Sequence, residues 1–267
     1  MSKRRASKVV GIPWSTLHYR PKPKNDEAIR ARLKVLADRH RRYGSPLLHK
    51  LLRKEGFVVN HKRTERLYRE ENLSLLRKNR RKRSKEPRIP IKPAARVNQN
   101  WAMDFIVDRF RDKRKLKAFT LIDEFNRESL AIDIDHSITG KRVGQILDRV
   151  VAARGKPEII RCDNGPEFIS IAMFEWAQDN GVLIYFIEPG KPAQNALIES
   201  FHSRFRDDFL NQHWFGTLRE AREADEVWRK HYNEKRPHSS LGDITPLEFA
   251  ASAQKTNAIS LTTTDTV

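Results

Sequence analysis

The sequence predicts an α/β protein in which a basic helical region precedes a mixed five-stranded sheet flanked by helices. The first observation behind this prediction is charge: residues 1–100 hold 30 Lys and Arg against 8 Asp and Glu, a net charge of +22, whereas residues 101–267 have a net charge of −3. The second is that, from residue 98, three apolar runs are followed by helical and strand-like segments in alternation. The asymmetry favours a nucleic-acid-binding region joined to a near-neutral body, and a basic surface without a partner is the alternative.

Composition excludes several classes of protein. Hydrophobic residues make up 38% of the chain, with 13 Phe and 5 Trp, which is enough to build a core. No apolar run approaches the ~20 residues that span a bilayer, and none follows the basic N-terminus. We therefore expect no membrane partner and a cytoplasmic location. The single cysteine, Cys162, excludes an intrachain disulfide framework and a Cys-based zinc site.

Residues 1–25 are predicted to be irregular, because prolines stand at positions 13, 21 and 23. Residues 26–76 are predicted to be a helical region in which apolar residues recur at helical spacing. The expected helices cover residues 26–42, 46–55 and 61–72.

The last two of these helices, joined by a short link, resemble a helix-turn-helix. Asn60 is a candidate cap for the third helix, which would present Arg63, Arg66 and Arg69 to DNA. A small helical hairpin without a DNA role has the same local pattern, so both interpretations stay open at this point.

A basic linker is predicted at residues 77–97. Eight of the twelve residues 77–88 are Lys or Arg, and prolines follow, so self-repulsion should keep the segment extended. Its central cations, Arg80, Arg81, Lys82 and Arg83, are candidates to lie along a phosphate backbone, while a solvated hinge is the simpler and compatible interpretation. Residues 256–267 are predicted to be a disordered tail.

Residues 98–255 are predicted to form the α/β core. Strands are expected at residues 101–107, 117–122, 129–134, 158–161 and 182–187, the first three as an antiparallel meander. Helices are expected at residues 139–153, 167–180, 192–211 and 218–233. This order matches the ribonuclease-H-like fold.

Two aspartates of this core occupy positions that are typical of catalytic or ligand-binding residues. Asp104 is the only charged residue in the apolar run 101–107, and a buried carboxylate is costly unless it is paired or binds a metal. Asp163 follows a short strand, at the edge where α/β sheets usually bind ligands. Each has a plain structural alternative, a strand edge or neutralised acid for Asp104 and an Asx turn for Asp163.

Glu199 lies on a predicted helix whose apolar face carries Phe201 and Phe205. At 100° per residue, Glu199 points away from that face and aligns with Arg206. A helix packed by its phenylalanines would therefore present both charges on its other side, although a solvated helix face is the default interpretation.

Together the three carboxylates indicate a metal site. Oxygen ligands suit Mg²⁺ or Mn²⁺, and a single cysteine cannot provide the thiolate ligands that softer metals prefer. Two such ions would hold the attacking and leaving oxygens of a phosphodiester displacement. No protein nucleophile is needed, which agrees with the absence of an obvious Ser-His or Cys-His pattern.

These motifs also resemble a known family. The segments W-A-M-D-F, R-C-D-N-G-P-E-F and N-A-L-I-E-S-F resemble the D-D-E triad of retroviral-integrase-like transposases. Asp163 and Glu199 are separated by 35 residues, the spacing familiar in that group. The segment from Tyr232 to Ala250 is similar to the ending of bacterial insertion-sequence transposases of the third-numbered family, as the product of their second reading frame.

The resemblance implies catalytic roles for Asp104, Asp163 and Glu199, a DNA contact for Arg206, and two Mg²⁺ or Mn²⁺ ions. It implies double-stranded DNA as the partner, both element ends and target, held by a homo-multimer. It also implies that activity needs the upstream reading-frame product or a fusion with it. The zinc module of retroviral integrases is absent, because one cysteine cannot build it.

Three further residues are candidates to support the site: Asn164, Glu167 and Asn195. For Glu167, an ordinary position at a helix start is the alternative. The predicted function is metal-dependent cleavage at the ends of a mobile element followed by strand transfer. A nuclease of the same fold that hydrolyses without joining is one rival, and a non-catalytic DNA-binding regulator is another.

Overall fold

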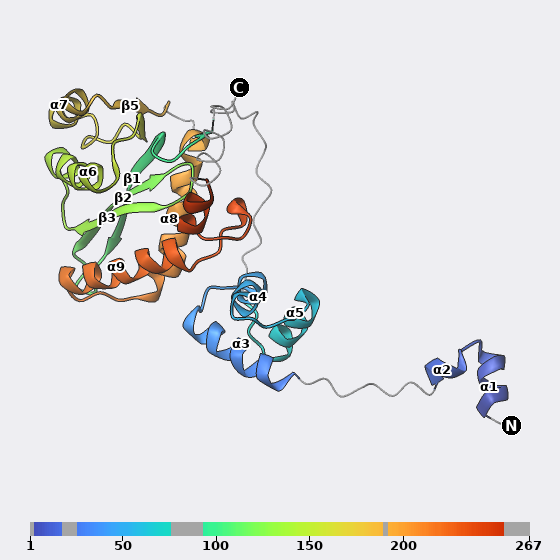
Figure 1. Cartoon of the computed structure of the whole chain (residues 1–267). Coiled ribbons are helices and arrows are strands. Elements are labelled where there is room, and N and C mark those ends of the chain that lie inside the picture. The colour runs from blue at the N-terminus through green and yellow to red at the C-terminus, as the bar shows by residue number, and fades with distance from the viewer. Residues whose placement is uncertain (1–2, 18–25, 76–92, 189–191, 254–267) are drawn as a thin grey trace, which may run out of the picture. The chain divides into compact units, whose positions relative to one another are not determined.

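The computed structural model describes residues 3–17, 26–75, 93–188 and 192–253 (Figure 1). The chain divides into two compact units, residues 1–39 with 43–74, and residues 40–42 with 75–267. Most of the predicted linker and all of the predicted tail lie outside the described residues. No helix in the described ranges is both long and apolar enough to cross a bilayer.

The first unit is helical from its beginning, so the prediction that residues 1–25 are irregular is wrong for α1 (Lys3–Val10) and α2 (Trp14–Leu17). Pro13 directly precedes α2, and its carbonyl accepts a hydrogen bond from the Thr16 N–H at 3.0 Å. A proline at a helix start loses no hydrogen bond, because the first N–H groups of a helix have no partner inside it. Gly11, with φ of 69°, separates the two helices.

The rest of the first unit confirms the expected three helices, α3 (Glu27–Arg39), α4 (Ser45–Lys54) and α5 (His61–Glu70). Their core includes four fully buried leucines, Leu33, Leu48, Leu52 and Leu67. Asn60 caps α5 as predicted, because its side chain accepts a hydrogen bond from the Lys62 N–H at 3.0 Å.

The second unit contains the predicted five-stranded mixed sheet, in the order β3-β2-β1-β4-β5. The strands are β1 (Asn100–Arg109), β2 (Lys115–Asp123), β3 (Ser129–Asp135), β4 (Ile159–Cys162) and β5 (Leu183–Phe186). β1, β2 and β3 form the antiparallel meander, whereas β4 pairs with both β1 and β5 in parallel. The carboxyl ends of β1 and β4 therefore point the same way.

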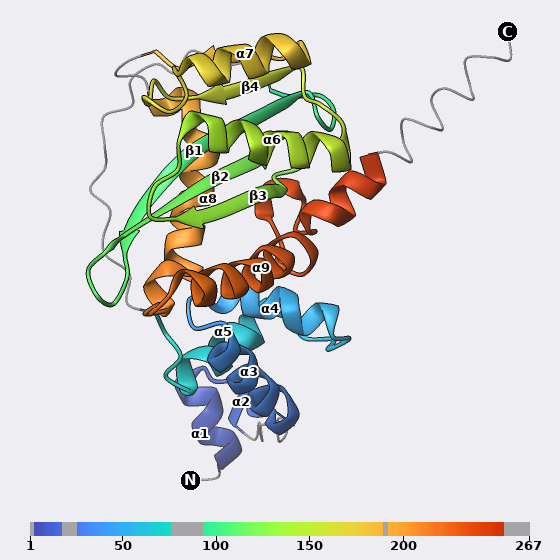
Figure 2. The same cartoon turned by 90° about the vertical axis from the view of Figure 1, so that its left-hand side faces the viewer.

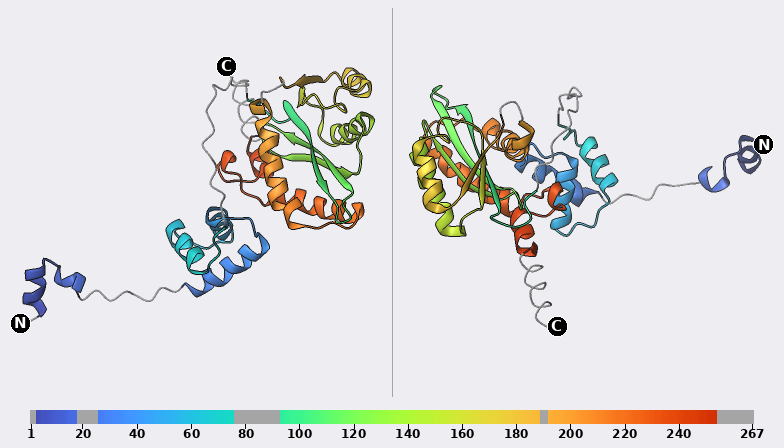
Figure 3. Two further views of the ribbon diagram at one scale, coloured as in Figure 1. Left: turned by 180° about the vertical axis from the view of Figure 1, so that it is seen from behind. Right: turned by 90° about the horizontal axis from the view of Figure 1, so that it is seen from above.

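Helices cover both faces of this sheet (Figure 2). They include α6 (Gly140–Arg154), α7 (Ile171–Asn180), α8 (Ala196–Asp208) and α9 (Leu218–Glu234), with short 3₁₀ turns at Pro192–Asn195, Leu210–Gln212 and Ser239–Leu241. Residues 246–253 are helical as well. Trp101 and Met103 of β1 pack in the same core as α6 and α7. Ala102 and Ile106 pack instead with the phenylalanines of α8, which lies along the other side of the sheet (Figure 3). The helix expected from residue 167 begins only at Ile171, after a turn.

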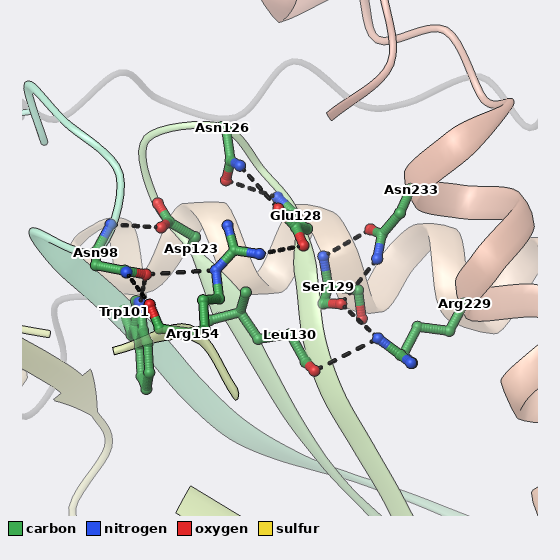
Figure 4. A network of polar contacts seen from close by, with 10 residues as sticks. All are labelled: Asn98, Trp101, Asp123, Asn126, Glu128, Ser129, Leu130, Arg154, Arg229 and Asn233. Atoms are coloured by element: carbon green, nitrogen blue, oxygen red, sulfur yellow. Dashed lines mark hydrogen bonds and ion pairs between the residues drawn. The ribbon is translucent and has the colours of Figure 1, made fainter. Parts of the chain in front are cut away.

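A polar network ties the turn between β2 and β3 to the ends of α6 and α9 (Figure 4). Asp123 accepts a hydrogen bond from the Asn98 N–H at 2.8 Å, and Asn98 in turn bonds the carbonyl of Arg154. Ser129 exchanges two hydrogen bonds with the Asn233 side chain at 2.9 Å. These contacts lie at the end of the sheet at which β1 begins. They link this end to α6 on one face of the sheet and to α9 on the other.

Gly140 is required by close packing at the start of α6. A Cβ there would lie 2.6 Å from the carbonyl oxygen of Glu167. We expect Gly140→Ala to lower the free energy of unfolding by about 1–3 kcal/mol, because the backbone must move. Gly144→Ala is the matched control in the same helix: its Cβ would meet the Trp176 ring at 3.4 Å, so this variant should melt at or above the wild-type temperature. Equal melting temperatures for the two variants would contradict the argument.

Candidate active site

Asp104 lies in the middle of β1, on the face covered by α8. The register of the sheet places Thr120 directly opposite, and the Thr120 hydroxyl donates to the Asp104 carbonyl oxygen at 2.9 Å. One carboxylate oxygen of Asp104 accepts the Phe105 N–H at 2.6 Å. The side chain is largely buried, with 20% of its area exposed. The strand therefore fixes a mostly buried carboxylate toward α8.

Asp163 reaches the same level from the neighbouring strand. β4 pairs with β1 in parallel with Ala102 beside Arg161, so two residues further along each strand bring Asp104 and Asp163 level. Asp163 begins a turn in which its Oδ1 accepts the Gly165 N–H at 2.9 Å. The Asx turn that the sequence allowed as an alternative is present, and it places the carboxylate beside Asp104.

Glu199 is exposed in the first turn of α8, while Ile198, Phe201 and Phe205 of that helix are buried. The predicted division of the helix is thus confirmed. Burial raises the pKa of Asp104 to about 7, and the negative charges of Asp163 and Glu199 contribute to the increase. Asp163, in the loop after β4, and Glu199, on α8, therefore both lie within electrostatic reach of Asp104.

His202, a residue that sequence reasoning missed, lies close to the Asp104 carboxylate. Its Nδ1 lies 3.7 Å from the Asp104 carboxylate, and its Nε2 lies 2.8 Å from the Thr120 hydroxyl. Burial lowers the pKa of His202 to about 4, helped by the charge of Arg206, so the imidazole is neutral near pH 7. The signal available in the sequence was its position three residues after Glu199, on the same side of a helix.

Among the residues that the structure describes, Asp104 has no charged cationic partner, because His202 is neutral near pH 7. Within the described ranges, no three or more His, Cys, Asp or Glu side chains are arranged so that they could hold a metal ion. The donor set is nonetheless all carboxylate oxygen around a buried strand position, which is the chemistry that Mg²⁺ and Mn²⁺ prefer. The residues fit a divalent cation by charge and by ligand type.

Arg206 lies further along the exposed side of α8, as predicted. Its Nη2 donates to the carbonyl oxygen of Val107 at 3.3 Å, and its Nη1 lies 3.8 Å from Asp108. The side chain is 45% exposed. An ion pair this long, with this exposure, is weak, so the guanidinium remains available to an anion.

The three supporting candidates have different surroundings. Asn164 is exposed and donates to the carbonyl oxygen of Ile187 at 3.0 Å. Glu167 pairs with Lys117, whose ammonium lies 3.8 Å above the Phe105 ring. Partial burial raises the pKa of Glu167, but the bond to Lys117 outweighs it and the pKa stays below its usual value. Asn195 is buried just before α8, and its Oδ1 has no hydrogen-bond partner among the described residues.

The predicted DNA-contacting arginines of α5 form ion pairs within the helical unit. Arg63 and Arg66 both bind the buried carboxylate of Asp26, at 2.6 Å, and their hydrogen bonds hold the pKa of Asp26 below its usual value. Arg69 pairs with Glu65 at 2.5 Å. The linker cations at positions 80–83 lie outside the described residues. The structure therefore gives Arg63 and Arg66 a folding role that the sequence analysis had not foreseen.

Comparison with known proteins agrees with both units. The integrase core domain family matches residues 94–192 and, by a second family model, residues 180–246, and an HTH-like domain family matches residues 24–83. The 31.7 kDa protein of insertion element IS407 from Burkholderia multivorans is 44% identical over 96% of this chain and 93% of its own length. The chain belongs to the insertion-element transposases with an integrase core.

More distant relatives agree with this family. The putative transposase InsK of insertion element IS150 from Escherichia coli is 24% identical over 89% of each chain. An intasome structure of simian T-cell lymphotropic virus shares the fold, with a TM-score of 0.52 and 16% identity over 82% of this chain and 74% of that one. The transposase acts in DNA transposition, its core has the ribonuclease-H-like fold, and core domains of this type use divalent metals. The predicted family, fold and function are thereby confirmed.

Proposed function

We propose that Asp104, Asp163 and Glu199 are the catalytic triad of this transposase and that they hold two Mg²⁺ or Mn²⁺ ions. One observation carries the proposal: the negative charges of Asp163 and Glu199 act on Asp104 from two other elements, and no charged cation among the described residues pairs with Asp104. Bringing like charges together in a buried site costs free energy, and a bound divalent cation offsets that cost.

When bound, the divalent ions would supply Lewis-acid stabilisation of the attacking and leaving oxygens of a phosphodiester. The chain's own residues fix the geometry. Thr120 and the Phe105 N–H hold Asp104, and the Asx turn holds Asp163. In the first reaction, water displaces a 3′-oxygen at the element end. In the second, the released 3′-hydroxyl displaces a 3′-oxygen of the target strand, so that one phosphodiester is broken for each one formed.

The working complex is proposed to contain double-stranded DNA, as element ends and target, and more than one copy of this chain, since two ends must be joined. The upstream reading-frame product, alone or fused to this chain, is a further proposed partner. Asn164, Glu167 and Asn195 are proposed to support the site. The strongest support is for Asn195, whose buried Oδ1 at the start of the Glu199 helix has no hydrogen-bond partner in the described part of the chain.

The experiment that tests this function incubates the full chain with labelled element ends and a supercoiled target, in Mg²⁺, Mn²⁺ or EDTA, with and without the upstream product. Cleaved ends joined to the target are expected with either metal and not with EDTA. Cleavage without any joined product would favour the stand-alone nuclease. Binding without cleavage under every condition would favour the regulator.

Arg206 is proposed to bind a DNA phosphate beside this site. Arg206→Ala should reduce strand transfer about 10- to 100-fold, because a hydrogen bond to a charged group contributes ~1.5–3 kcal/mol. The melting temperature should stay nearly constant, since the ion pair with Asp108 is long and exposed. Arg204→Ala, at another exposed arginine of the same helix, is the matched control and should join strands normally. A lower melting temperature with wild-type joining would show that Arg206 serves the fold instead.

A further inference from the structure

Trp214 is an exposed aromatic side chain on a fixed backbone. It is 83% exposed, in the segment between α8 and α9. Both neighbours are anchored: His213 Nδ1 lies 2.8 Å from the Phe209 carbonyl oxygen and its ring stacks on Phe215, which is buried in the core. The indole is therefore presented to solvent by a packed segment. One exposed aromatic alone is ordinary, so its surroundings decide what it indicates.

The tip of the β1–β2 hairpin lies next to Trp214 and is strongly basic. The Arg111 N–H donates to the Phe215 carbonyl oxygen at 2.9 Å, which joins the tip to the residue after Trp214. Residues 109–115 contain five Lys and Arg and one acid, and all except Phe110 are exposed. The acid, Asp112, pairs with Arg114 at 2.5 Å, whereas Arg111 and Lys113 make no ion pair within the described residues. Arg109 and Lys115 are paired across the strands, although like charges in that position repel.

This surface continues from the candidate active site. Arg109 lies five residues beyond Asp104 on β1, which corresponds to about 17 Å along the strand. Arg206 contacts Val107 and Asp108 between these two positions. Figure 2 shows the hairpin projecting past β4 toward the segment between α8 and α9. Carboxylates, Arg206 and the hairpin tip therefore follow one another over a distance of about five base pairs, at 3.4 Å each.

We propose that Trp214 and the hairpin tip bind the target duplex about five base pairs from the reacting phosphate, an inference that rests on the proposed active site. Lys and Arg contacts to phosphates position a duplex without reading its sequence. An apolar side chain beside them can insert at an easily deformed base step and bend the duplex. Such a surface binds DNA without reading its sequence, so we assign it to the target duplex and not to the specific recognition of an element end.

The test uses pre-cleaved element ends, so that joining to target is measured apart from cleavage. Trp214→Ala should lower joining about 10-fold, with Trp214→Phe restoring most of it, because stacking on a base contributes ~1–3 kcal/mol. Val227→Ala, at an apolar residue of α9 that is 70% exposed, is the matched control and should join normally. Arg111→Glu with Lys113→Glu should lower joining and reduce the steepness of its salt dependence.

Trp214→Ala should cleave intact ends at the wild-type rate. If this variant lost cleavage and joining equally, Trp214 would not be specific for the target duplex and the proposal would be overturned. Wild-type joining by Trp214→Ala would overturn it as well. Crosslinking of a bromodeoxyuridine-substituted target to the full-length chain provides a readout without turnover: we expect a crosslink at Trp214 that Trp214→Phe removes. This crosslink should persist in Asp104→Asn. The active-site proposal is tested separately by the same variant, because cleavage by Asp104→Asn would show that Asp104 is not catalytic. A crosslink confined to element-end DNA would overturn the proposal.

Discussion

Asp104→Asn, Asp163→Asn and Glu199→Gln are each expected to abolish cleavage and joining, by about three orders of magnitude or more, while leaving DNA binding largely intact. The three carboxylates act as one unit, so a double variant should lose little more than a single one. Their contribution to DNA affinity should be small, because they repel phosphates and the cationic surfaces lie elsewhere in the chain. The measurement is turnover on labelled ends beside equilibrium binding to the same DNA.

The same variants offer a readout that separates loss of chemistry from loss of fold. The pKa of Asp104 is about 7 in the folded protein against 3.8 for an ordinary aspartate, so without metal the folded state loses stability as pH rises from about 4 to 7. Asp104→Asn should therefore melt above wild type at pH 8, in the absence of metal, and at nearly the same temperature at pH 4. Glu175→Gln, which removes an exposed acid from α7, is the matched control and should retain activity. An inactive Asp104→Asn that melts lower than wild type at pH 8 would contradict the argument.

Periodicity predicted most of this fold because each strand and helix of the core buries one regular face. The phenylalanines of α8 left Glu199 and Arg206 on the outer side, and the structure shows this division. The position of Asp163 was also predictable. The residues D-N-G indicate a turn, and their place directly after a strand puts that turn at the carboxyl edge of the sheet. Local pattern was sufficient wherever the deciding contacts lie within a few residues of one another.

Contacts between distant segments could not be predicted in this way. Arg63 and Arg66 looked like free cations, and only the fold brings Asp26 to them from about 40 residues away. The contact of His202 with Thr120 likewise depends on the register between β1 and β2 and on how α8 packs. The prediction that residues 3–17 are irregular was wrong for another reason: proline was taken as a helix breaker, whereas Pro13 stands where a helix tolerates it.

Deleting residues 1–95 is expected to weaken binding to duplex DNA by orders of magnitude and to flatten its dependence on salt. The first hundred residues carry a net charge of +22 and the remainder −3. Counterion release makes log affinity fall linearly with log salt, with a slope of about −0.9 for each neutralised phosphate. The measurement is affinity for a labelled duplex at several salt concentrations, for the full chain and for residues 96–267.

A second variant tests charge without removing the helical unit. Replacing Arg80, Arg81, Lys82 and Arg83 with Gln leaves α3, α4 and α5 unchanged, and should reduce the slope by up to ~3.6 if all four reach phosphates. Arg63 and Arg66 are poor substitutes for this purpose, because each binds the buried carboxylate of Asp26 and their loss would destabilise the unit. If residues 96–267 bound duplex DNA with the affinity and salt dependence of the full chain, DNA affinity would reside in the catalytic unit. Because that unit is nearly neutral overall, its binding surface would then have to be formed by local groups of cations such as Arg206 and the hairpin tip.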